Sequence, residues 1–299
     1  HSPDGGSRQR MKRVKKYLSL MRVKHYIKNL LVFAAAGCSG RLFEKNVAVP
    51  ALLGFAAFCL TSSLIYIIND LRDAPKDRLH PVKKSRPIAS GAVTERAAVI
   101  LSILLFLAAS GISVIIGRVL SAVLLAAYLA MNIGYSFGLK DVPMIDITIL
   151  AAGFLVRVMY GAAVTGIAVS DWLYLTVISV AFYCALGKRR NELKRTGSGT
   201  RTVLKNYSPE FLDKNMYMCL ALANVFYALW STDGSTAELY GGKHMVFTVP
   251  IVLLITMKYS MDVEGDSDGD PVEVLLHDRV LLCLTALYLA AMFVILYIV

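Results

Sequence analysis

The chain has 299 residues, of which 56% are apolar and 18% are charged. Soluble domains average about 45–50% apolar and about 25% charged residues, so this composition excludes a water-soluble globular enzyme and a disordered chain. The net charge is +11. No nucleic-acid-binding signature accompanies it, so we attribute the charge to cytoplasmic loops of a membrane protein and expect no nucleic-acid partner.

The apolar residues fall into blocks of about 18–22 residues that carry almost no charge, the length of a helix that crosses roughly 30 Å of hydrocarbon. The pattern predicts an all-α, polytopic membrane protein with nine transmembrane helices in a single domain over residues 11–299. Residues 1–10 are polar and rich in Gly and Ser, so we expect a vector-derived remnant or a disordered tail. The predicted spans are 26–40, 47–68, 96–116, 119–138, 145–164, 169–186, 211–231, 244–261 and 278–298.

Basic residues predict the orientation. With the N-terminus inside, the inside segments contain the Lys and Arg clusters at 8–28, 72–96 and 188–214. The outside connections then hold only Arg41, Lys45, Arg118 and Lys243. This asymmetry follows the positive-inside rule and favours an odd number of spans.

Residues 11–28 mix apolar and cationic residues. We expect an amphipathic helix that lies on anionic lipid, and the alternative is a plain polybasic flank.

The most informative polar segment is 69–91, directly after the second span. Asn69, Asp73 and Asp77 are spaced i, i+4 and i+8, which places them on one face of a helix. Mg²⁺ prefers such oxygen ligands together with water and substrate phosphates, so we expect a metal site there, with Asp70 assisting. Pro75 predicts a broken turn from which Asp77 reaches the metal. The alternative is an ordinary solvated loop.

Cations follow this acidic segment, among them Lys83 and Arg86, and a second cationic stretch occupies 187–195 with Lys188 and Arg189. Carboxylates that hold a metal and cations that hold phosphate oxygens together make a metal–diphosphate site. The alternative for 188–195 is positive-inside charge alone. The acidic run at 262–270 lacks the EF-hand spacing, and we expect a solvated loop or a lid over the site.

Arg157 lies inside the fifth span, where a charge is costly and usually faces a cavity or a partner. Asp146 lies on nearly the same helix face, so one interpretation is that the two line a cavity that admits phosphate; the alternatives are a structural ion pair or a snorkelling side chain. Tyr66, Lys28, Tyr135 and Lys140 lie at the cytoplasmic ends of their spans. They either reach the same cavity or anchor the helices at the interface.

The segment N69-D-x-x-D73-x-x-x-D77 resembles the NDxxDxxxD motif of the UbiA superfamily of intramembrane prenyltransferases. The second aspartate-rich loop of that superfamily is replaced here by GKRRNE at 187–192, which has one carboxylate, Glu192. This pattern is similar to the decaprenyl-phosphate phosphoribosyltransferase branch of the superfamily. Further segments that match this branch are YIKNLLVF at 26–33, YIIND at 66–70, HPVKKSRP at 80–87, YSFGLK at 135–140 and PVEVLLHDR at 271–279.

The resemblance implies an Mg²⁺-dependent transfer of 5-phosphoribosyl from phosphoribosyl diphosphate to a polyprenyl phosphate, with release of diphosphate, as in the supply of arabinose to a cell wall. It implies a multi-pass protein of the inner (plasma) membrane whose active site faces the cytoplasm, with membrane lipid as a partner. Homo-oligomer formation is left open. The alternatives are a UbiA-type prenyltransferase that consumes prenyl diphosphate and, in another class, a transporter.

We therefore expect three groups of site residues. The catalytic residues are Asp73, Asp77 and Asp70, and the metal ligands are Asn69, Asp73 and Asp77. The substrate-binding residues are Lys28, Tyr66, Lys83, Arg86, Tyr135, Lys140, Arg157, Lys188 and Arg189.

Overall fold

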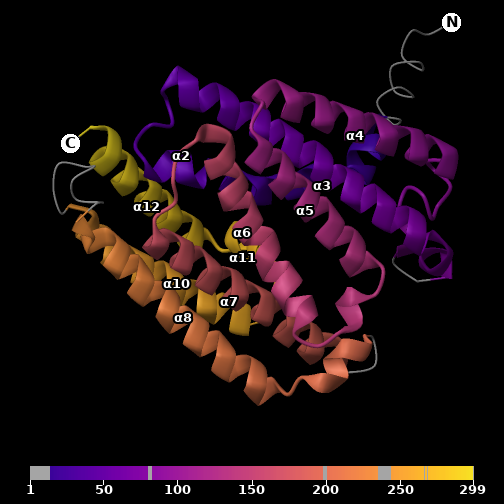
Figure 1. The fold of residues 1–299 in the computed structure, drawn as a ribbon. Helices are drawn as coiled ribbons and strands as arrows, with labels where there is room; N and C mark the ends of the chain where they lie inside the picture. Colours follow the sequence, from indigo (N-terminus) through magenta and orange to yellow (C-terminus); the bar gives the residue numbers. More distant parts are fainter. Residues whose placement is uncertain are drawn as a thin grey trace, which may run out of the picture.

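The computed structural model describes residues 14–79, 83–197, 201–234, 244–265, 267 and 269–298. This part of the chain is all-α, which confirms the predicted fold class. Figure 1 shows α6 between α5 on one side and α7 on the other, and the contacts of α6 with both helices agree. The main helices are α3 (Lys45–Leu79), α4 (Glu95–Ile116), α5 (Val119–Ser136), α6 (Ile145–Thr165), α7 (Asp171–Thr196), α8 (Pro209–Thr232), α10 (Val249–Glu264), α11 (Pro271–His277) and α12 (Arg279–Tyr297).

Within the described ranges, six helices are long and apolar enough to cross a membrane: α3, α4, α5, α6, α12, and α10 with the 3₁₀ turn His244–Thr248 before it. Their exposed apolar side chains, such as those of α4, form a surface suited to lipid tails. Helices α7 and α8 have 26 and 24 residues and are also long enough, but they are more polar. The chain is therefore an integral membrane protein.

The predicted span at 26–40 is not a continuous α-helix. It consists of an 11-residue 3₁₀ helix, η1 (Val23–Phe33), and the five-residue α2 (Ala34–Cys38). Because a 3₁₀ helix rises about 2.0 Å per residue against 1.5 Å in an α-helix, the two together extend about 30 Å. The segment is therefore about as long as an α-helix of roughly 20 residues.

The amphipathic helix expected over 11–28 is shorter than predicted. The described part of it is helical over 14–20, and the chain then turns at Arg22, whose φ is 52°. A left-handed residue cannot continue a right-handed helix, so η1 begins as a new element.

Two helices are longer than the membrane requires. Helix α3 has 35 residues, about 52 Å at 1.5 Å per residue, and α7 is about 39 Å long. The excess length of α3 carries the acidic residues after position 68, and that of α7 carries the cationic residues from position 188. The segment 188–195, expected as a loop, is therefore the helical end of α7.

Small residues let the elements around the site approach closely. A Cβ atom on Gly161 of α6 would overlap the carbonyl oxygen of Val32 in η1, so only glycine permits this contact. Buried side chains on α3, α5 and α6, including Phe58 and Tyr160, complete the core beside η1. This packing fixes η1 against α6.

Candidate active site

A cavity of about 460 Å³ opens among η1, α3, α5, α6 and α7. Its wall combines apolar side chains, such as Ile149 and Phe154, with charged ones. Residues from distant parts of the sequence meet here because the extended ends of α3 and α7 lie beside α5 and α6. The sequence-predicted residues that line the cavity are Lys28, Tyr66, Asn69, Tyr135, Arg157, Lys188 and Arg189.

The charge of the cavity is strongly positive. Among the described residues that line it, Glu192 is the one carboxylate. The cations are Lys28, Arg157, Lys188, Arg189, Arg195 and Arg201. Such a surface favours substrates that carry several phosphate groups, because cations that converge on one volume raise the local concentration of anions.

Arg157 is a buried cation of this wall and is 7% exposed. Its Nε donates to Asn29 Oδ1 at 2.9 Å, and its Nη2 donates to Tyr128 Oη at 2.9 Å. The guanidinium carbon also lies 5.3 Å from the ring centre of Phe58, within the range of a cation–π interaction. Arg157 has no acidic partner within the described ranges, so its charge is available to an anion in the cavity.

Asp146 does not pair with Arg157. Its Oδ2 lies 2.8 Å from Arg189 Nε, with both side chains buried, although the two atoms are not aligned as a hydrogen bond. Arg189 also pairs with Glu192 and donates to Tyr135 Oη at 2.9 Å. The charge of Arg189 is thus compensated within the protein, and its main effect is to shape the cavity wall.

Tyr207 closes this network from the connection between α7 and α8. Its hydroxyl donates to Asp146 Oδ1 at 2.6 Å and accepts from the backbone N–H of Met144 at 2.6 Å. Burial and the neighbouring Asp146 carboxylate raise the pKa of the Tyr207 hydroxyl, so it stays a neutral donor. The network holds the beginning of α6 in place.

Lys28 Nζ donates to Asp270 Oδ2 at 2.5 Å. Burial alone would raise the pKa of the Asp270 carboxyl, but the nearby Lys28 and Lys188 ammonium groups outweigh it and lower the pKa. Asp270 also caps α11 by accepting from the backbone N–H of Val272. This contact joins the acidic segment 262–270 to the cavity wall, where we had expected a solvated loop or a lid.

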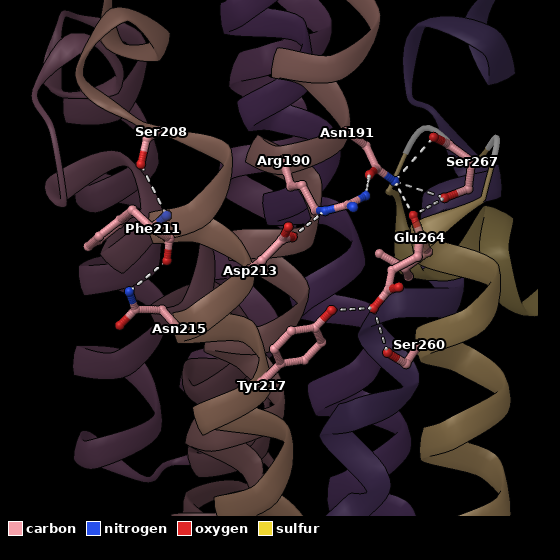
Figure 2. Close-up of polar contacts among 11 residues, drawn as sticks. Arg190, Asn191, Ser208, Phe211, Asp213, Asn215, Tyr217, Ser260, Glu264 and Ser267 are labelled. Carbon is pink, nitrogen blue, oxygen red and sulfur yellow. Dashed lines mark hydrogen bonds and ion pairs between the residues drawn. The ribbon is translucent and has the colours of Figure 1, made fainter.

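The described part of residues 263–271, which we call the strap, is anchored on α7. Figure 2 shows Asn191 of α7 pointing at Ser267, and its Nδ2 donates to the Val263 and Ser267 carbonyls at 2.8 and 3.2 Å. Gly269 has a φ of 76°, and a Cβ there would lie 2.9 Å from Lys188 Cα. The strap can therefore lie directly on α7 only because position 269 is glycine.

The acidic residues of α3 are arranged differently from the expectation. Helix α3 continues through Pro75 to Leu79, so Asp77 does not project from a broken turn. On a continuous helix Asn69 and Asp77 are separated by eight residues, about 12 Å, which is too far for both to bind one ion directly. Asp77 instead pairs with Arg86 at 2.7 Å.

Asp70 is also occupied, since it pairs with Arg22 at 2.8 Å and with Arg86 at 3.3 Å. Asp73 is half-buried and makes no hydrogen bond or ion pair with any described residue. Asn69 presents its side-chain oxygen at the cavity wall, in contact with Ser136 Oγ. Asn69 and Asp73, one helical turn apart, are the oxygen donors of α3 best placed for a metal.

This donor set fits Mg²⁺ as a partial site. The described residues contain no group of three or more His, Cys, Asp or Glu side chains that could hold a metal alone. Mg²⁺ commonly takes one or two protein oxygens and completes its six ligands with water and substrate phosphates. Asn69 and Asp73 match that role.

Residues 30–271 match the UbiA prenyltransferase family. The chain belongs to this family.

Three similar relatives are named decaprenyl-phosphate phosphoribosyltransferase. The chain is 36% identical to the protein from Mycolicibacterium smegmatis, over 88% of its own length and 87% of the relative. It is 34% identical to that from Corynebacterium glutamicum, over 88% and 81%, and 31% identical to that from Mycobacterium tuberculosis, over 90% of each. The likeness therefore extends over nearly the full length of all three.

Solved structures support the fold. A UbiA homologue from Archaeoglobus fulgidus bound to DMAPP and Mg²⁺ superimposes with a TM-score of 0.69 at 19% identity, covering 95% of this chain and all of that one. The apo structure of a homologue from Aeropyrum pernix gives 0.59 at 18% identity, covering 89% and 98%. At these identities the likeness establishes the shared helical architecture of the family.

Three predicted substrate-binding residues do not line the cavity of this UbiA family member: Lys83, Arg86 and Lys140. Lys83 is exposed in a 3₁₀ turn, and Arg86 is engaged by Asp70 and Asp77. His80, which belongs to the motif at 80–87, lies outside the described residues.

Sequence reasoning missed the cavity residues Tyr128, Asn132, Arg195 and Arg201. Arg195 could have been found, because it lies seven residues after Lys188 and so on the same face of a continuous helix. Tyr128 and Asn132 carry no signal of their own, since a Tyr or Asn inside an apolar span resembles an ordinary core residue. Arg201 does not stand out from the other cations of the basic segment 188–214.

Proposed function

We propose that this chain transfers a 5-phosphoribosyl group from phosphoribosyl diphosphate to a polyprenyl phosphate and releases diphosphate, as the names of its relatives indicate. The observation that carries the proposal is the cavity, in which six described cations face one carboxylate. The two substrates together bring phosphate, diphosphate and a lipid phosphate into the same volume. An ordinary prenyl transfer brings a single diphosphate and needs far less positive charge.

In the reaction, the bond from the anomeric carbon of ribose to the diphosphate oxygen breaks and a bond to a lipid phosphate oxygen forms. The acceptor is already an anion, so no general base is required. Glu192, the one described carboxylate in the wall, is paired with Arg189 and Arg201 and is not placed to act as one. Direct displacement inverts the anomeric carbon.

The residues divide the work by position. Lys28 and Lys188 neutralise phosphate, and Asp270 holds the Lys28 side chain in place. Arg189, held by Asp146 and Tyr135, maintains the shape of the cavity wall. Asn69 and Asp73 would hold Mg²⁺, which when bound neutralises the charge of the departing diphosphate.

We further propose nine spans, with the N-terminus inside and the cavity open to the cytoplasm of the inner (plasma) membrane. Helices α7 and α8, together with the η1–α2 segment of about 30 Å, supply three crossings in addition to the six apolar helices. The cationic ends of α3 and α7 then fall on one side, as the positive-inside rule requires.

A label-transfer assay on purified protein in detergent tests the activity. Labelled phosphoribosyl diphosphate is offered with polyprenyl phosphate, in the presence of Mg²⁺ or of chelator. We expect metal-dependent label in the lipid phase. A folded sample that leaves this donor intact but consumes prenyl diphosphate with an aromatic acceptor would overturn the proposal in favour of ordinary prenyl transfer.

A further inference from the structure

Arg157 is a cation whose hydrogen-bonding capacity is only partly used. Nε, Nη1 and Nη2 each donate once, to Asn29 Oδ1, Gly153 O and Tyr128 Oη. A guanidinium has five N–H groups, so one N–H remains on each terminal nitrogen. Donors on the two terminal nitrogens of one guanidinium can bind two oxygens of one phosphate.

Aromatic rings surround the guanidinium of Arg157 and limit its exposure. The guanidinium carbon lies 5.3 Å from the Phe58 ring centre, 5.1 Å from that of Tyr128 and 5.9 Å from that of Phe154. The side chain is 93% buried, because its exposed fraction is 7%. A phosphate bound there would face an oriented, desolvated cation, and such contacts are stronger than those at an exposed arginine.

Arg157 and the acidic end of α3 lie at different positions along α5. Its partner Tyr128 and the Asn69 partner Ser136 are eight residues apart on α5, about 12 Å along the helix. The cavity therefore has two levels for anions. One level is at Asn69, one helical turn before Asp73, and the other is at Arg157.

We infer that Arg157 binds the 5-phosphate of the phosphoribosyl donor; this rests on the proposed function. The donor carries anions at both ends of one furanose, a diphosphate on C1 and a phosphate on C5. With the C1 diphosphate beside Asn69, where the proposed metal would bind, the C5 phosphate reaches the level of Arg157. The lipid acceptor has one phosphate, so it does not occupy two separated levels by itself. The level of Arg157 selects a phosphorylated ribose over a ribose without the 5-phosphate.

The test compares two donors, phosphoribosyl diphosphate and ribose 1-diphosphate, which lacks the 5-phosphate. The wild type, Arg157→Gln, Arg157→Lys and the control Arg118→Gln are assayed with the same polyprenyl phosphate. Arg118 is exposed at the connection between α4 and α5, and its substitution removes the same charge away from the cavity.

We expect the wild type and Arg118→Gln to prefer the phosphorylated donor by roughly 100-fold or more in kcat/KM, since a site built for a polar group discriminates strongly against its absence. Arg157→Gln should lose this preference to within a few fold, by losing activity on the phosphorylated donor alone. Equal losses on both donors, or a raised KM for polyprenyl phosphate at unchanged donor preference, would overturn the inference.

Thermal unfolding in detergent checks that each variant is folded. If Arg157→Gln is unfolded, Arg157→Lys carries the same test, because lysine keeps the charge but lacks the two terminal nitrogens of the guanidinium. Binding of ribose 5-phosphate in the presence of chelator gives a second readout. We expect Arg157→Lys to weaken it and Arg118→Gln to leave it unchanged, and equal binding by both would contradict the inference. A wild type that uses neither donor refutes the proposed function itself. This outcome differs from failure of the inference, in which the wild type is active but the donor preference does not depend on Arg157.

Discussion

Asp146 Oδ2 lies 2.8 Å from Arg189 Nε at a place where the two side chains are 0% and 1% exposed. One arginine of the cavity is thus neutralised from within the protein. Arg157 and Lys188, by contrast, have no acidic hydrogen-bond or ion-pair partner among the described residues. The cavity therefore separates cations that maintain its shape from cations that are available to phosphate.

Asp146→Asn should reveal the structural role of this pair. Removing one partner of a buried ion pair leaves the other charge uncompensated, and the usual cost is about 3–5 kcal/mol. We expect a loss of that order in the free energy of unfolding, measured in detergent. Asp213→Asn is the matched control, because Asp213 pairs with Arg190 (Figure 2) and both side chains are more exposed than those of Asp146 and Arg189. Its loss should cost about 1 kcal/mol or less. Equal losses in the two variants would contradict this account.

Asp73→Asn and Asp77→Asn should differ, although the two residues belong to one sequence motif. Asp73 is unpaired within the described residues, whereas Asp77 pairs with Arg86 at 2.7 Å. We expect Asp73→Asn to lower kcat by about 100-fold or more and to weaken the response to Mg²⁺, as for a lost metal ligand. Asp77→Asn should mainly lower the melting temperature. The reverse pattern, with stability unchanged and Mg²⁺ response lost in Asp77→Asn, would show that Asp77 is the ligand.

Asn191→Ala should loosen the strap. Its side chain donates to two strap carbonyls, and leaving buried acceptors unsatisfied costs about 1–3 kcal/mol. We expect faster hydrogen exchange in the peptide that carries Val263 and Ser267, with an accompanying rise in KM as Asp270 releases Lys28. Asn215→Ala is the control, since Asn215 donates only within α8, to Phe211 O (Figure 2). Unchanged exchange in Asn191→Ala would argue against the anchor.

Gly161→Ala should prevent η1 from packing on α6. The added Cβ would overlap the Val32 carbonyl oxygen, and backbone cannot move aside as a flexible side chain can. We expect a loss of several kcal/mol or a failure to fold, as in other overpacked cores, where the cost is about 1–3 kcal/mol or more. Gly111→Ala is the control, because no atom lies within 4 Å of its Cβ position. It should be neutral or stabilise by up to about 1 kcal/mol, since alanine favours a helix. A Gly161→Ala protein as stable as the control would exclude close packing here.

Much of the fold could be predicted from the sequence, because crossing a bilayer imposes a length and an apolar composition that are visible in the chain itself. The helices α4 and α12 lie within a residue or two of the predicted spans. The segment η1–α2 differs, since it is a 3₁₀ helix that packs on α6 at Gly161, about 130 positions away. That contact cannot be predicted from the local sequence.

The sequence by itself determined the chemistry: charge-free spans, an acid-rich segment after one span, a cationic segment after another, and a family motif that joins them. Only the tertiary structure decided which charges remain free for substrate. Spacing places Asp146 and Arg157 on one helix face, yet each binds a residue from elsewhere in the chain, Arg189 and Asn29. Charge pairing acts over a few ångströms in space, so residues distant in sequence compete for the same partner. That competition is settled only when the helices have packed.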